Sequence, residues 1–158
     1  MSALLAASVR ASSVHLFLDE IKAAISDEQA APLQSDEHVV ALRKLVRERA
    51  VEFRLSLVDQ TKLVTAASEL ARNTLKYGGG GEVYAFSVAS GMKQGIGLSF
   101  VDAGPGIDDI EQALTDGYTS GGGLGLGLGG AKRLVDMFHI HSKKGEGTAV
   151  TIIKWVRS

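Results

Sequence analysis

The chain has 158 residues, the length of one domain, and 45% of them are hydrophobic, which is enough to bury a core. A formal net charge of −1 excludes a global field that would attract nucleic acid or an anionic membrane. The sequence has no cysteine, which excludes disulfides, thiolate metal sites and cysteine nucleophiles, and no apolar run approaches the roughly 20 residues of a membrane helix. We therefore expect a cytoplasmic protein that binds neither nucleic acid nor membrane.

The part of the chain before Gly78 contains no glycine and is predicted to be helical, because apolar residues recur there at helical spacing. Helices are expected from Ser12 or Ser13 to about Ile25, from Ser35 or Asp36 to about Phe53, and from Asp59, as the N-cap, to about Tyr77. Residues 26–35 are expected to form a connector, with room for a short strand around Pro32–Gln34.

All 19 glycines lie between Gly78 and Gly147, and the apolar period changes to two after a helix stop at Gly78–Gly81. We predict a strand hairpin, a short helix, a longer helix and a closing strand pair at, in order, Glu82–Ala89 and Ile96–Val101, Ile107–Leu114, about Leu128–Phe138, and Ile140–Ser142 and Ala149–Val156. These elements predict an α/β two-layer sandwich, with a mixed, mostly antiparallel sheet covered on one face by helices.

Glu69 and Asn73 lie four residues apart on the third predicted helix, so they share one face at the edge of its apolar stripe. A carboxylate can accept a proton from a hydroxyl or a water, and an amide oxygen is a hard ligand that suits Mg²⁺. The two side chains could line a pocket where the helix meets the sheet. Taken alone, the pair is more simply interpreted as part of a solvated helix face.

The motif Asp102–Gly106 follows the predicted strand Ile96–Val101. An aspartate at a strand end can accept a hydrogen bond from an exocyclic amine such as that of adenine. The two glycines, Gly104 and Gly106, let the backbone pass close to a flat ring. An ordinary turn rich in Asp, Pro and Gly explains the motif equally well.

The glycine-rich segment Gly121–Gly130 leads into the helix that carries Lys132 and Arg133, and glycine amides at a helix N-terminus can bind an anion. The segment satisfies G-x-G-x-x-G, but the dinucleotide fingerprint needs a strand directly before the loop, and here the preceding residues are polar and glycine-rich. A P-loop is excluded because no Gly-Lys-Ser/Thr occurs. The stretch Gly145–Thr148, taken alone, is a plain β-turn.

The order of these motifs is more specific than any one of them. Glu-x-x-x-Asn on a helix, Asp-x-Gly-x-Gly after a strand, Gly-x-Gly-Leu-Gly before a helix and Gly-Thr before a last strand closely resemble the GHKL, or Bergerat-fold, ATPase family. The resemblance covers roughly residues 36–158, which we expect to form an ATP-binding kinase domain after an N-terminal helical extension and connector at 1–35. In detail, the sequence is most similar to the RsbT-type serine/threonine switch kinases, in the stretches Glu69–Asn73, Asp102–Ile107, Asp116–Gly122, Lys132–Asp136 and Lys154–Trp155.

The resemblance implies a role for each matching residue. Glu69 would be catalytic and activate the attacking hydroxyl of a protein substrate, while Asn73 would hold Mg²⁺ against the phosphates of ATP. Asp102 would recognise the adenine amino group. The remaining nucleotide contacts would be a backbone floor for the ring at Gly104 and Gly106, a supporting hydroxyl at Thr148, and a phosphate-wrapping lid at Gly123, Gly125 and Gly127.

The function implied by the resemblance is an ATP- and Mg²⁺-dependent protein serine/threonine kinase of a bacterial partner-switching pathway in stress or sigma-factor regulation. It would phosphorylate a STAS-domain antagonist and, when released, bind a phosphatase regulator or another effector. An anti-sigma factor that occludes a sigma factor, and a non-catalytic nucleotide-dependent switch module, are the alternatives.

Two features depart from the family pattern. The run Leu126–Gly129 stands where relatives often carry Ala and Pro, which could loosen the lid and lower nucleotide affinity. Residues 1–35 have no counterpart in compact members. Their amphipathic helix could pack on the domain, bind a partner or pair two chains as a homodimer, and we favour packing.

Overall fold

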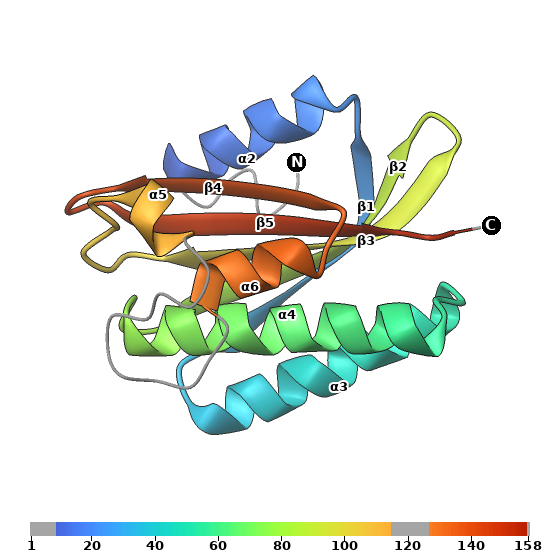
Figure 1. Cartoon of the computed structure of the whole chain (residues 1–158), viewed down its shortest axis with the longest axis horizontal. Coiled ribbons are helices and arrows are strands. Elements are labelled where there is room, and N and C mark those ends of the chain that lie inside the picture. Colours follow the sequence, from blue (N-terminus) through green and yellow to red (C-terminus); the bar gives the residue numbers. More distant parts are fainter. Residues whose placement is uncertain (1–8, 115–126, 158) are drawn as a thin grey trace.

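The computed structural model describes residues 9–114 and 127–157 (Figure 1). The elements in chain order are α2 (Val9–Glu20), β1 (Ala24–Leu33), α3 (Asp36–Glu52), α4 (Leu57–Lys76), β2 (Gly81–Ser90), β3 (Lys93–Asp102), α5 (Ile110–Ala113), α6 (Gly127–Arg133), β4 (Met137–Lys143) and β5 (Gly147–Trp155). The strands form one sheet in the order β1-β2-β3-β5-β4, and each of the four pairings between these described strands is antiparallel. The α/β fold class predicted from the sequence is confirmed.

Helices α3 and α4 begin where serine side chains cap them. Ser35 accepts a hydrogen bond from the backbone N–H of His38, and Ser56 accepts one from that of Asp59. The prediction of Asp59 as the N-cap of α4 is therefore wrong by three residues. Asp59 lies in the first turn and is buried, 7% exposed, where its carboxylate pairs with Lys154 of β5.

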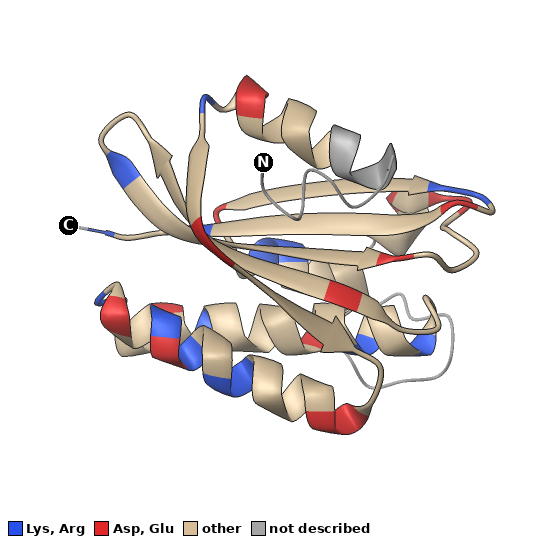
Figure 2. Cartoon of the chain, turned by 180° about the vertical axis from the view of Figure 1, so that it is seen from behind, with Lys and Arg blue, Asp and Glu red and all other residues tan. Residues whose placement is uncertain are grey.

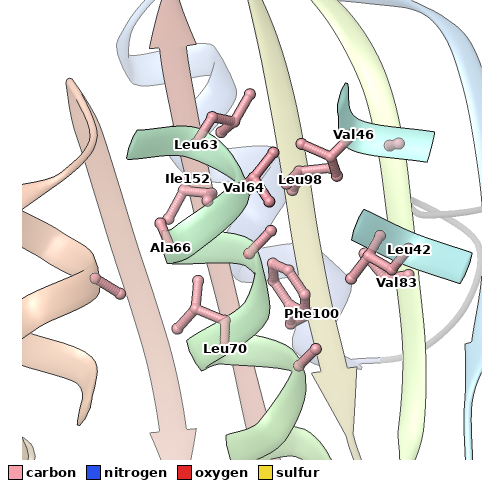
Figure 3. Close-up of a cluster of buried hydrophobic side chains, with 14 of the residues drawn as sticks. Leu42, Val46, Leu63, Val64, Ala66, Leu70, Val83, Leu98, Phe100 and Ile152 are labelled. Carbon is pink, nitrogen blue, oxygen red and sulfur yellow. The ribbon is translucent and has the colours of Figure 1, made fainter. Parts of the chain in front are cut away.

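The main core lies between these helices and one face of the sheet. Leu63 and Leu70 of α4 and Val46 of α3 point toward Leu98 and Phe100 of β3 (Figure 3). Each of these five side chains is at most 2% exposed, and burying one of them fully is worth about 1.5–3 kcal/mol. The spacing of seven residues on α4 and of two on β3 places one apolar stripe of each element in this layer.

Helix α2 packs on the opposite face of the sheet, across from α3, α4 and α6 (Figure 1). Val14, Phe17 and Leu18 are buried there against Phe86 of β2 and Ile153 of β5. This confirms the expectation that the N-terminal helix packs on the domain. It also adds helical cover on a second face, which the predicted fold class did not place.

Most of the segment predicted as a connector belongs to an edge strand, β1, which spans Ala24–Leu33. β1 pairs with β2, with a register shift between Ser26 and Gln29, where Asp27 has a φ of +49°. Pro32 is tolerated because an edge strand needs no N–H on its open side. The short strand expected around Pro32–Gln34 therefore overlaps only the end of β1, because the few apolar residues of this strand do not alternate through the bulge.

The predicted helix Leu128–Phe138 is shorter than expected. α6 ends at Arg133, and the chain enters β4 at Met137. Asp136 fixes this entry, because its backbone N–H donates to Ile153 and its carboxylate accepts from the backbone N–H of Trp155 at 2.7 Å. A tertiary contact thus ends a segment whose apolar spacing suits a longer helix.

A buried ion cluster joins this corner to the start of α4. Lys154 Nζ lies 3.5 Å from Asp59 Oδ1 and 3.6 Å from Asp136 Oδ1, and only 4% of the lysine side chain is exposed. Arg157 reaches the same two carboxylates at 3.5 and 2.6 Å from the solvent side. The cluster holds β5, the α6–β4 junction and α4 together.

Charged residues are concentrated on the helices and at loop ends, whereas the strands are mainly uncharged (Figure 2). This is expected of a sheet with helices packed on it, because its central strands β2, β3 and β5 are mostly buried. None of the described helices is both long enough and apolar enough to span a membrane.

Candidate active site

A cavity of about 800 Å³ opens beside the C-terminal half of α4. Its walls come from α4, the ends of β3 and β5, the segment that contains α5, and the start of α6. A cavity of this size is in the range of small-molecule and cofactor sites. It brings together Glu69, Asn73, Asp102, Gly106, Gly127 and Thr148 of the residues predicted from sequence.

Helix α4 places Glu69 and Asn73 on the cavity wall, one turn apart. The Glu69 side chain is only 13% exposed, and its Oε1 accepts a hydrogen bond from Arg72 Nη1 at 3.1 Å. The helix ends directly after this pair, because the backbone N–H groups of Tyr77 and Gly78 both donate to the carbonyl of Asn73. The two side chains therefore project from a rigid helix at its last turns, at the edge of the apolar stripe, as predicted.

Asp102, the last residue of β3, is held by backbone donors. Its Oδ1 accepts from the N–H of Gly104 at 2.9 Å and from the N–H of Thr148 at 3.3 Å. A side chain at Gly78 would collide with it, because a Cβ there would lie 2.5 Å from Asp102 Oδ2. Gly78 thus does more than stop the helix, since it leaves the space that the aspartate occupies.

Ser142 of β4 is a residue of the site region that the sequence did not reveal. Its Oγ accepts from the N–H of Ile107 at 2.8 Å and donates to the carbonyl of Gly147 at 3.1 Å. It also lies 2.7 Å from Thr148 Oγ1. Ser142 therefore ties the loop after Asp102 to the turn before β5. Only its position opposite Thr148 points to this role, and that position follows from the register of β4 and β5, which the sequence does not show.

The predicted glycines have different roles. Gly106, with a φ of +80°, lines the cavity and lets its loop touch the β4–β5 turn, since a Cβ there would lie 2.3 Å from the carbonyl oxygen of Lys143. Gly104 is not among the lining residues and instead supports Asp102 through its N–H. Gly127 lines the cavity where α6 begins. Gly123 and Gly125 lie outside the described residues.

The chemistry of the cavity changes along α4. At one end, Asp102 lies beside Gly78 and near the apolar side chains of Ile107 and Val150, which suits a flat ring with an amino group. Glu69 is nine residues before Gly78, about 13 Å away along the helix, and there the wall is polar and charged. A ligand with a planar base at one end and an anionic tail at the other fits this arrangement.

The comparisons with known proteins agree with that geometry. Residues 58–157 match the family described as histidine kinase-, DNA gyrase B-, and HSP90-like ATPases. The chain is 42% identical over 133 residues to the serine/threonine-protein kinase RsbT of Bacillus subtilis (strain 168), a match that covers 84% of this chain and all of that protein. It is also 40% identical over 60 residues to the anti-sigma F factor of Clostridium beijerinckii, which is 36% of this chain and 42% of that protein.

Among solved structures, the RsbU and RsbW domains of Rv1364c from Mycobacterium tuberculosis are similar with a TM-score of 0.58 and 20% sequence identity. The similarity covers 84% of this chain and 34% of that one, and it supports the fold alone. The match to the ATPase family and the match along the full length of RsbT carry the assignment, and both imply the use of ATP. The chain belongs to the histidine kinase-, DNA gyrase B- and HSP90-like ATPase family, among the serine/threonine-protein kinases that resemble RsbT.

Proposed function

We propose that this protein transfers the γ-phosphoryl group of ATP to a serine or threonine of a STAS-domain antagonist in a bacterial partner-switching pathway. The observation that carries the proposal is the meeting of Glu69, Asn73 and Asp102 in one cavity. The similarity to RsbT and to an anti-sigma factor supports a pathway in which regulators exchange partners. After its release, the kinase would bind a phosphatase regulator or another effector.

In the proposed reaction Glu69 is the general base. Its carboxylate takes the proton of the substrate hydroxyl as the hydroxyl oxygen bonds to the γ-phosphorus, and the bond from that phosphorus to the β–γ bridging oxygen breaks, which releases ADP. Positioning and electrostatics dominate such a transfer. Asp102 would accept a hydrogen bond from the adenine amino group, supported by Gly104, Gly106 and Thr148.

Asn73 is the residue that we propose for Mg²⁺. No group of three or more His, Cys, Asp or Glu side chains in the described part of the chain could hold a metal ion. A single amide ligand beside an anionic tail nevertheless fits Mg²⁺, which in nucleotide sites is held by one or two side chains together with phosphate oxygens and water. The ion would neutralise charge on the phosphates. Gly123 and Gly125, with Gly127, remain the proposed lid.

The chain organisation also remains a proposal. Residues 36–158 would form the kinase domain, and residues 1–35 would be an extension that supplies α2 and β1. Pairing of two chains through this extension is an open alternative to a monomer.

The test of the function compares the rates at which the wild type and Glu69→Gln transfer phosphate to a partner protein. With Mg²⁺, labelled ATP and a cognate STAS-domain protein, the wild type should label the partner. Glu69→Gln should transfer label at least about 100-fold more slowly while still binding nucleotide, because it lacks only the base. Glu48→Gln, at an exposed position of α3, is the matched control and should keep the wild-type rate. Equal rates for wild type and Glu69→Gln would show that Glu69 is not the base.

A second function, that of an anti-sigma factor, is favoured by the similarity to the anti-sigma F factor. Such a protein would keep the nucleotide site and act by occluding a sigma factor. Co-purification with a sigma factor would support it, whereas exclusive capture of a phosphatase regulator would contradict it. Tight nucleotide binding without transfer to any STAS-domain protein would instead indicate a non-catalytic switch module.

A further inference from the structure

Positive charge at the cavity comes from one helix. Among the described residues that line it, the cationic ones are Arg72 and Lys76 of α4. The segment 115–126 contains no lysine or arginine, so it adds no cation. The lining also contains four carboxylates, at Glu69, Asp102, Asp108 and Asp109. An anionic triphosphate tail in this cavity would therefore depend strongly on the two α4 cations.

The two cations differ in position. Arg72 is three residues from Glu69 and bonds its Oε1 at 3.1 Å, whereas Lys76 is one turn further along α4, toward Gly78 and Asp102. Phosphoryl transfer needs the γ-phosphate next to the base that activates the attacking hydroxyl. Of the two cations, Arg72 is thus the one placed to meet the γ-phosphate.

The geometry of the Glu69–Arg72 pair allows Arg72 to leave Glu69 for another anion. The Arg72 side chain is 57% exposed while that of Glu69 is 13% exposed, so the arginine can turn into the cavity more freely than the glutamate can leave it. A pair with one solvated partner adds little stability. A guanidinium donates two parallel N–H hydrogen bonds, and a phosphate offers a pair of acceptor oxygens for them as readily as a carboxylate does.

We propose that Arg72 is a catalytic residue that exchanges Glu69 for the γ-phosphate when ATP binds. This rests on the proposed function only in placing the γ-phosphate beside Glu69. In the free or ADP-bound protein, Arg72 occupies Oε1 of Glu69. When ATP arrives, Arg72 binds the γ-phosphate, and the carboxylate is released to take the proton of the substrate hydroxyl. Oε1 of Glu69 would then be free to act as the base only when there is a phosphoryl group to transfer.

The test is the affinity for ADP and for a non-hydrolysable ATP analogue, both with Mg²⁺, measured by calorimetry. Arg72→Ala should weaken binding of the analogue about tenfold or more, because a charge-assisted bond is lost, and leave ADP affinity within about twofold. Arg72→Lys should restore part of the loss, because it keeps the charge without the fork. Lys62→Ala, an exposed cation of the same helix, is the matched control and should change neither affinity.

The nucleotide affinities of Glu69→Gln test the same exchange from the side of the carboxylate. Freed from the carboxylate, Arg72 should bind the analogue at least as tightly as in wild type, with ADP affinity unchanged, and Arg72→Ala in that background should remove the gain. An equal loss for both nucleotides in Arg72→Ala, no loss at all, or weaker analogue binding in Glu69→Gln would overturn the exchange. These measurements need no partner protein. A wild type that prefers the analogue but labels no STAS-domain protein would therefore contradict the proposed function and not the exchange.

Discussion

The two faces of the sheet differ in how much they bury and in what their polar side chains do. The face under α3, α4 and α6 has the larger buried apolar cluster, the fully paired Lys154 and, at the strand ends, the cavity. The other face has a smaller cluster under α2. Its described polar contacts include a hydrogen bond of 2.9 Å between Ser13 and His139.

The α4 face therefore holds functional and buried charged side chains in place, whereas the other face mainly attaches α2 to the sheet. On the α4 face, buried charges and backbone donors fix Lys154 and Asp102 from several elements at once, so a change there should be costly. On the α2 face, His139 is only partly buried and stacks on Phe17 with ring centroids 4.8 Å apart. We expect effects to decline from the ion cluster, through the nucleotide site, to the α2 contact.

The largest effect is expected from Lys154→Met. The substitution leaves the carboxylates of Asp59 and Asp136 together in a buried corner with only the exposed Arg157 as a cation. Breaking a buried pair in this way costs about 3–5 kcal/mol, and we expect the lower end because Arg157 remains. Urea denaturation at neutral pH would measure the loss of unfolding free energy.

Nucleotide affinity of the folded Lys154→Met protein should be unchanged. Asp59 and Asn73 are fourteen residues apart, about 21 Å along α4. Lys144→Met, at an exposed position of the β4–β5 turn, is the control and should stay within about 0.5 kcal/mol of wild type. If both variants unfold at the same urea concentration as wild type, the ion cluster contributes no net stability and the contrast between the two faces is lost.

The helices and strands that could be predicted from the sequence are those in which apolar residues recur at one regular spacing. The helices around Val46 and Leu70 and the hairpin around Leu98 follow one repeat from end to end. Only the end of β1, around Pro32, could be predicted as a strand, because the bulge at Asp27 interrupts the alternation along the rest of it. The end of α6 could not be predicted either, since Asp136 is drawn into the sheet by Trp155, a residue nineteen positions later.

Asp102→Asn should give an intermediate effect, confined to binding. The asparagine keeps an oxygen for the N–H groups of Gly104 and Thr148, so the unfolding free energy should change by less than about 1 kcal/mol. It loses the charge with which the aspartate would accept from an adenine amine, and such a bond is worth about 1.5–3 kcal/mol. Titration with ADP should therefore show a Kd raised about tenfold to 100-fold. A variant that binds ADP as wild type does would remove Asp102 from base recognition.

The residues of the site also fall into two groups. Some are recognised from their spacing in the sequence, and others only from their neighbours in the structure. Glu69 with Asn73, and Asp102 with Gly106, are short-range patterns whose order along the chain is informative. Ser142 carries no such pattern, because its role depends on Ile107, which is distant in sequence and adjacent in space. The placement of Gly123 and Gly125 in the lid stays a prediction.

The smallest effect is expected from the pH dependence of the α2 face. Burial lowers the pKa of His139 below its ordinary value of 6.5, His141 lowers it further and Glu20 opposes them. In the unfolded chain this histidine binds its proton at higher pH than in the folded protein. The stability linked to neutral His139 is therefore fully present above about pH 6.5 and is lost as the pH falls from there through the folded-state pKa.

Urea denaturation at pH 7.5 and 5.5 would measure this dependence. His139→Gln can still bond Ser13 but does not titrate, so its unfolding free energy should fall less between the two pH values than that of wild type. His15→Gln removes an exposed histidine of α2 that pairs with Asp19, and it should keep a slope nearer that of wild type. Because His139 is only half-buried, the difference should be small beside that of Lys154→Met. A His139→Gln slope as steep as that of wild type would mean that α2 is held by its apolar side chains alone, whatever the charge state of β4.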